Sequence, residues 1–171
     1  MESHRPGDKG PTLSGVHLAS VTTTEESEIH FTVEQWAPDG FLLTPFIDGR
    51  SFVSLVTEFE VGHGWEDAGI HEGMVLSRLD FEHLPRHPVQ GRSPYGHPSR
   101  GTVLLGCTCG VIDCGPLYGR VLASEGQIRW LEFENPVADD LDWDYSELGP
   151  FVFDSAQFEQ AITDAMAQAL G

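Results

Sequence analysis

Three cysteines, Cys107, Cys109 and Cys114, lie within eight consecutive residues, and the chain of 171 residues contains no others. Thiols gathered in one segment can hold a thiophilic metal ion, form a redox pair or pack as inert side chains. On a strand, Cys107 and Cys109 would point to the same face, because side chains alternate along a strand. A turn at Gly110 would then bring Cys114 back beside them. The spacing therefore predicts three converging thiols.

Zinc is the cofactor that this cluster predicts, with the three cysteines and His97 as metal ligands. Zinc requires a fourth ligand, for which His63, His71 and His83 are alternatives and Asp113 is a weaker one. The spacing is not the C-x2-C pair of zinc knuckles, so inert buried thiols explain it equally well. Redox chemistry is a third alternative. No Lys or Arg stands nearby to lower a thiol pKa, and Asp113 would raise it, which argues against a nucleophile.

Other chemistry-bearing patterns are missing from the sequence. The carboxylates from Asp139 to Asp144 are spaced like those of a calcium loop, but Tyr145 and Phe151 stand where an EF-hand needs Gly and Glu. Phosphate-binding glycine loops and the sequence motifs of zinc proteases and serine hydrolases are absent. We therefore assign no catalytic residue.

Charge restricts the choice of partner. The chain has 27 acidic and nine basic residues and a formal net charge of −18, which opposes binding to nucleic acid or to an anionic membrane. Residues 125–164 contain eleven acidic residues and only one base, Arg129. This segment predicts a docking surface for a basic protein partner. Solubility alone explains the excess as well.

Length and composition favour a single soluble domain in the cytoplasm. No apolar run approaches the roughly 20 residues of a membrane span. The N-terminus lacks the apolar core of a secretory signal. We expect residues 1–14 to form a disordered tail and residues 15–171 to form one domain.

The elements that must position the cysteines are strands and two helices. Alternation predicts strands over residues 15–22 and 28–34, and Pro45 indicates that residues 41–47 form an edge or bulged strand. Apolar spacing predicts a short helix after Ser51. Residues 84–100, which are rich in Pro and Gly, are expected to form a long loop.

The C-terminal half predicts a strand that leads into the cysteines, then a hairpin and a final helix. The strand covers residues 102–109, and the hairpin pairs residues 118–123 with 127–133. Asp154 is the expected N-cap of a helix over residues 155–170, with Gln157 as its capping-box partner. Together these elements predict an α+β fold with a largely antiparallel sheet, a short internal helix and a C-terminal helix.

From Thr102 onward the chain resembles an uncharacterised family of bacterial proteins that is common in actinobacteria. The residues that carry the resemblance are Leu104-Leu105-Gly106-Cys107-Thr108-Cys109-Gly110, Cys114, Pro116-Leu117, Trp130, Phe133 and the stretch from Gly149-Pro150 to Asp154. The family signature resembles L-L-G-C-x-C-G-x-x-G-C-W-P-L, followed by W-x-x-F and a terminal G-P-F-x-F-D. Asp113 and Gly115 replace its Gly and Trp. The resemblance supports the domain assignment and implies no activity.

Two functions from different classes follow from these patterns. The first is an acidic cytoplasmic binding protein, for example an inhibitor or immunity-type protein, whose cysteine cluster holds a structural zinc ion. The second is a zinc- or thiol-dependent enzyme that uses Cys107, Cys109 and Cys114. Only the enzyme requires an accessible, reactive centre.

Overall fold

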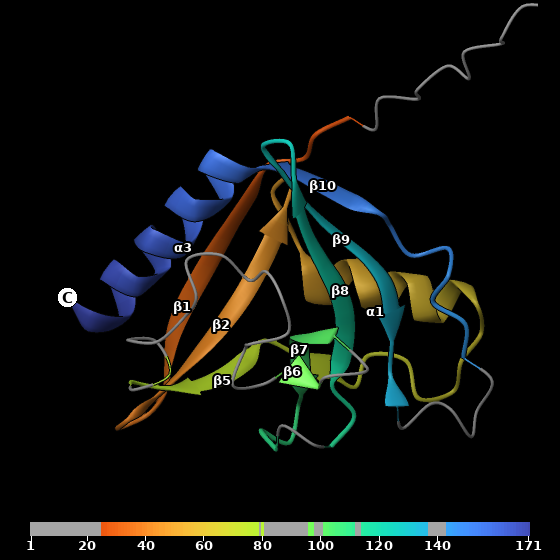
Figure 1. The fold of residues 1–171 in the computed structure, drawn as a ribbon. Helices are drawn as coiled ribbons and strands as arrows, with labels where there is room; N and C mark the ends of the chain where they lie inside the picture. The colour runs from red at the N-terminus through yellow and green to blue at the C-terminus, as the bar shows by residue number, and fades with distance from the viewer. Residues whose placement is uncertain (1–24, 79, 81–95, 98–100, 112–113, 137–142) are drawn as a thin grey trace, which may run out of the picture.

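The protein has an α+β fold built from antiparallel sheets and two helices, one internal and one C-terminal (Figure 1). The computed structural model describes residues 25–78, 80, 96–97, 101–111, 114–136 and 143–171. The predicted strand at 15–22, the predicted tail at 1–14 and most of the predicted loop at 84–100 lie outside this part of the chain.

A four-stranded sheet contains β1 (Ile29–Ala37), β2 (Gly40–Ile47), β3 (Arg50–Ser51) and β5 (Met74–Ser77). The prediction that residues 41–47 form an edge or bulged strand is wrong, because β2 lies between β1 on one side and β3 and β5 on the other. The two short strands pair with residues 46–47 and 40–43 of β2. Pro45, which has no N–H to donate, falls in the gap between them.

A six-stranded sheet has the order β10-β9-β8-β7-β4, and β6 also pairs with β7. Its strands are β4 (His71–Glu72), β6 (Gly96–His97), β7 (Gly101–Cys107), β8 (Leu117–Ser124), β9 (Gln127–Glu134) and β10 (Phe151–Asp154). The predicted hairpin is confirmed. Glu125 and Gly126 join its strands with φ of 52° and 80°, as a two-residue type I′ turn requires.

The chain passes from the six-stranded sheet to the four-stranded sheet at Gly73, between β4 and β5. A Cβ atom at this position would lie 2.6 Å from the carbonyl oxygen of Leu43 in β2. Only glycine permits this close approach of two backbones. The short strands β4 and β5 were not predicted from the sequence, since segments of two and four residues carry little periodicity.

Both predicted helices are confirmed. The internal helix α1 (Phe52–Gly62) buries Phe52, Val56 and Glu60, which recur every four residues on one face. The C-terminal helix α3 (Ser155–Leu170) begins at Asp154, whose Oδ1 accepts a hydrogen bond of 2.9 Å from the backbone N–H of Gln157.

The predicted capping-box role of the Gln157 side chain is wrong. Its amide instead hydrogen-bonds the backbone of Ile29 in β1, with Nε2 donating to the carbonyl oxygen at 2.6 Å and Oε1 accepting from the N–H at 3.3 Å. The helix start is thereby attached to β1, and Figure 1 shows α3 running along that strand.

Aromatic side chains join these elements into a single core. Phe158 of α3 packs against Phe31 of the four-stranded sheet and against Trp130 and Phe153 of the six-stranded sheet, with ring centroids 5.8 to 6.0 Å apart. Phe158 therefore bridges the two sheets. In α1, Phe52 contacts Trp130 at 5.5 Å, so both helices pack against this residue of the six-stranded sheet.

We predict that Phe158→Ala lowers the free energy of unfolding by about 3 to 5 kcal/mol, because it leaves a cavity where α3 meets both sheets. Urea unfolding measures this loss. The control Val61→Ala, which truncates a side chain 62% exposed on α1, should change stability by less than about 0.5 kcal/mol. A loss below about 1 kcal/mol for Phe158→Ala would show that α3 is peripheral.

Candidate metal centre

β7 ends at Cys107, so the predicted strand over residues 102–109 is too long and Cys109 lies in a turn instead of on the strand. The cysteines lie on two consecutive turns at the end of β7. The first turn closes with a hydrogen bond of 2.8 Å from the N–H of Gly110 to the carbonyl oxygen of Cys107. Gly110 has φ of +75°, a conformation that favours glycine. In the second turn the N–H of Cys114 donates to the carbonyl oxygen of Val111 at 3.1 Å. The two turns bring Cys114 back towards Cys107 and Cys109, as the sequence predicts.

The three Sγ atoms lie within 4.8 Å of one another and could hold a metal ion. Sulfurs bound to one zinc ion at about 2.3 Å in tetrahedral geometry are separated by about 3.8 Å, so small side-chain rotations suffice to close the site. Cys107 is buried, whereas Cys109 and Cys114 are exposed at the surface. An ion could therefore enter from solvent.

The hydrogen bonds of the turn favour a thiolate at Cys109. The pKa of Cys109 lies below its ordinary value, chiefly because the backbone N–H of Val111 donates to the sulfur and also because the thiols of Cys107 and Cys114 do so. The complementary bond to Cys109 raises the pKa of Cys114 to about 11. The lowering at Cys109 needs no Lys or Arg, a source that sequence reasoning did not consider.

The histidines that were predicted as alternative zinc ligands contact other residues where the structure describes them. No histidine or carboxylate joins the three sulfurs in a cluster within the described part of the chain. His63 contacts the carbonyl oxygen of Phe59 at 2.8 Å, and His71 contacts Glu60. His83 and Asp113 lie outside the described residues.

The position of His97 follows from its backbone. His97 pairs with Gly101 at the start of β7, whereas Cys107 ends that strand. Six residues of strand correspond to about 20 Å. A bond from His97 to the same ion as Cys107 would have to span most of this length, so the register weighs against His97 as the fourth ligand.

Apolar side chains surround the first turn. The indole of Trp36, which is 46% exposed, covers Gly110, and Val111 is 57% exposed beside it. A small apolar pocket next to Cys107 is lined by Met74, Leu76, Val103 and neighbouring residues. This side of the first turn is therefore mainly apolar.

A buried carboxylate that sequence reasoning missed lies behind the centre. Glu60 of α1 is fully buried, and its Oε1 accepts a hydrogen bond of 2.8 Å from the hydroxyl of Tyr145 and lies 3.0 Å from Nε2 of His71. Its Oε2 accepts the backbone N–H of Gly69 at 2.8 Å. The available signal was the fourfold spacing that places Glu60 on the same helix face as Phe52.

These contacts keep Glu60 ionised. Burial alone would raise its pKa, but the contact with His71 and the hydrogen bonds from Gly69 and Tyr145 outweigh burial, and the net pKa lies below its ordinary value. The network also reaches the cysteines, because His71 pairs directly with Cys107 across β4 and β7. The N–H of Thr108 donates to the carbonyl oxygen of Ile70 at 3.0 Å.

Comparison of the chain with protein-family models, curated protein sequences and solved structures finds no significant match. The resemblance of the C-terminal part to a bacterial family therefore stays a prediction. Within the described residues, no helix is long and apolar enough to cross a membrane.

We predict that Tyr145→Phe lowers the free energy of unfolding by about 1.5 to 3 kcal/mol, since it removes a hydrogen bond to a buried charged group. Urea unfolding at neutral pH measures the loss. The exposed substitution Glu34→Gln serves as the control and should leave stability within about 0.5 kcal/mol. An unchanged stability for Tyr145→Phe would show that the hydroxyl contributes nothing to holding Glu60.

The same carboxylate predicts a pH dependence. Because the folded pKa of Glu60 lies below the ordinary value of 4.5, its contribution is complete above that value and is lost as the pH falls through the folded pKa. Between about pH 5 and pH 3, the stability of Glu60→Gln should therefore fall less steeply than that of the natural chain. Parallel curves for the two proteins would contradict this role.

Proposed function

We propose that this protein is a non-catalytic, acidic binding protein in which Cys107, Cys109 and Cys114 hold a structural zinc ion. The observation that carries the proposal is the approach of three thiols to within 4.8 Å in two back-to-back turns. Thiolates are the preferred ligands of structural zinc sites. The ion would fix the connection between β7 and β8 near the middle of the six-stranded sheet.

The hydrogen bond from the N–H of Val111 supports the zinc proposal. A donor aimed at the sulfur stabilises the thiolate form, which is the form that binds metal. A zinc site also requires a fourth ligand. Because of the strand register, we assign this place to Asp113 or to water in preference to His97.

The binding part of the proposal rests on charge. The net charge of −18 favours a basic protein partner and disfavours nucleic acid. Among the acidic residues of segment 125–164, Asp139, Asp140 and Asp142 lie outside the described residues. An inhibitor or immunity-type protein is one example of this class, and a cytoplasmic location stays a prediction.

The exposed Cys109 supports a second candidate, a thiol-dependent enzyme. Its pKa is lowered, and Cys114 lies close enough to act as a resolving thiol. The two candidates differ in the metal-free state of the purified protein. An enzyme of this kind carries a reactive Cys109 without metal, whereas a structural zinc protein loses stability when the ion is removed.

We predict that protein purified without a histidine tag contains up to one zinc ion per chain, measured by elemental analysis. Native thiol titration should find Cys109 and Cys114 unreactive although both are exposed. Burial protects Cys107 only, so the protection of the two exposed thiols would come from bound zinc. Cys107→Ser and Cys109→Ser should each lose the zinc and unfold at lower temperature.

The matched control is Thr108→Ala, which changes an exposed side chain between the two ligands and should keep the zinc. Protein that contains no metal and whose three thiols all react freely with a thiol reagent would end the zinc proposal. Rapid reaction of Cys109 alone in metal-free, stable protein would favour the thiol enzyme.

A further inference from the structure

Two stacked indoles lie at the partly exposed edge of the core, between the end of α1 and the segment before β10. Trp65 and Trp143 are half-buried, and their rings are parallel within 5° with centroids 4.7 Å apart. His63 lies 5.2 Å from Trp65, and Tyr145 lies beneath it at 5.1 Å. We call the residues His63, Trp65 and Trp143 the indole surface.

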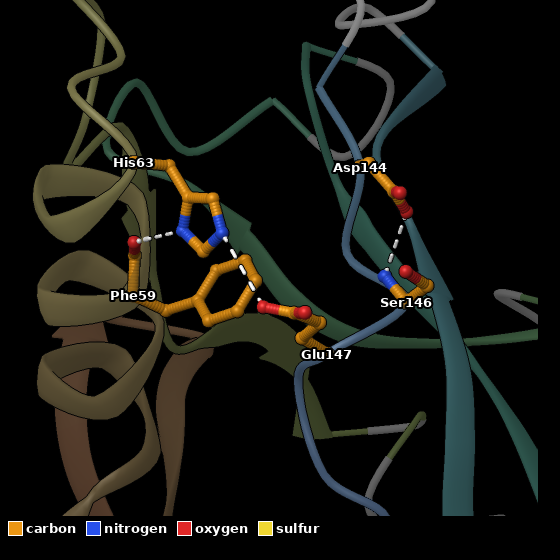
Figure 2. A network of polar contacts seen from close by, with 5 residues as sticks. All are labelled: Phe59, His63, Asp144, Ser146 and Glu147. Atoms are coloured by element: carbon orange, nitrogen blue, oxygen red, sulfur yellow. Dashed lines mark hydrogen bonds and ion pairs between the residues drawn. The ribbon is translucent and has the colours of Figure 1, made fainter.

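Trp65 and His63 of the indole surface are positioned by contacts with α1 and Tyr145. The backbone N–H of Trp65 donates to the carbonyl oxygen of Glu60 at 3.2 Å, and the hydroxyl of Tyr145 donates to the Glu60 side chain. The ring of Phe59 packs against His63 at 4.2 Å, and Nδ1 of His63 contacts the Phe59 carbonyl oxygen (Figure 2). A partner would therefore meet rings that are already in place and would spend little entropy on ordering them.

Each tryptophan is followed in sequence by exposed carboxylates. Glu66 and Asp67 follow Trp65, and Asp144 follows Trp143. Glu147, whose side chain is 81% exposed, lies 3.9 Å from Nε2 of His63 (Figure 2).

These carboxylates carry unbalanced negative charge. Hydrogen bonds from Ser146, beginning with its backbone N–H, lower the pKa of Asp144, so this group is ionised at neutral pH. Within the described residues, no arginine or lysine forms an ion pair with Glu66, Asp67, Asp144 or Glu147. A cation from outside the chain would supply the missing positive charge.

We propose that the indole surface and its four carboxylates bind an arginine side chain of a basic protein partner. A guanidinium group is planar and stacks on an aromatic face, and its five N–H donors match carboxylate oxygens. A lysine ammonium supplies the charge without the stacking plane. The inference deepens the binding part of the proposed function and is independent of the zinc ion.

The choice of arginine also follows from the composition of the surface. Charge complementarity alone would attract any basic peptide, because the whole chain is negative. Tryptophan is the aromatic side chain that attracts cations most strongly. Indoles with carboxylates next to them in the chain therefore favour arginine over lysine and localise binding to this part of the surface.

The test uses a nona-arginine peptide and a nona-lysine peptide with the full chain, and calorimetry measures both affinities at physiological salt. We expect nona-arginine to bind more tightly than nona-lysine. The double variant Asp144→Asn/Glu147→Gln should weaken nona-arginine binding by about tenfold or more, since exposed pairs and cation–π contacts add up to roughly that amount. Trp143→Phe should reduce the preference for arginine by severalfold.

Two control variants separate local recognition from overall charge. Glu25→Gln/Glu34→Gln removes the same charge from exposed positions elsewhere, and Trp36→Phe changes a tryptophan outside the indole surface. Both should alter the affinity for nona-arginine less than the variants of the indole surface do. Urea unfolding verifies that every variant is folded.

The proposal is overturned if the two charge variants weaken binding equally, because long-range attraction would then account for all of it. Equal affinities for both peptides, unchanged by Trp143→Phe, would overturn it as well. Repeating the measurement with Cys109→Ser separates this inference from the zinc proposal. Binding that survives in this variant supports the indole surface whether or not the protein holds zinc, and binding that disappears contradicts its independence from the metal.

Discussion

The buried carboxylate of Glu60 is the interaction on which both candidate sites depend. Its carboxylate oxygens contact Tyr145, Gly69 and His71. Gly69 and His71 belong to one segment that follows α1, whereas Tyr145 is 85 residues away from Glu60 along the chain. A buried charge with fewer partners would strongly destabilise the fold, so these three contacts are required together. Through β4 the network supports the strand that ends at Cys107, and through Tyr145 it supports the indole surface.

Features determined by neighbouring residues could be predicted from the sequence. Asp154 is a helix cap because its side chain satisfies an N–H three residues away, and the cysteines converge because two short turns follow the end of β7. Both depend on geometry within a few residues. The α+β class follows from the sum of such local signals.

Features determined by distant contacts could not be predicted. The place of Pro45 in a central strand depends on two short strands that leave a gap for it, and the use of Gln157 depends on β1 lying beside α3. The burial of Glu60 requires His71 and Tyr145, neither of which is close in sequence. The position of His97 depends on strand register, which no local pattern specifies.

The two stacked indoles come from distant segments of the chain, so a partner that binds them depends on the folded state. Trp65 follows α1 and Trp143 precedes β10, so an unfolded chain does not contain the surface that the two rings form. A partner that binds this surface binds the native state only and stabilises it by mass action, by about 2.7 kcal/mol at a concentration one hundred times its dissociation constant. Saturation with such a partner would raise the melting temperature of the whole domain, and destabilised chains would gain the most native population from it.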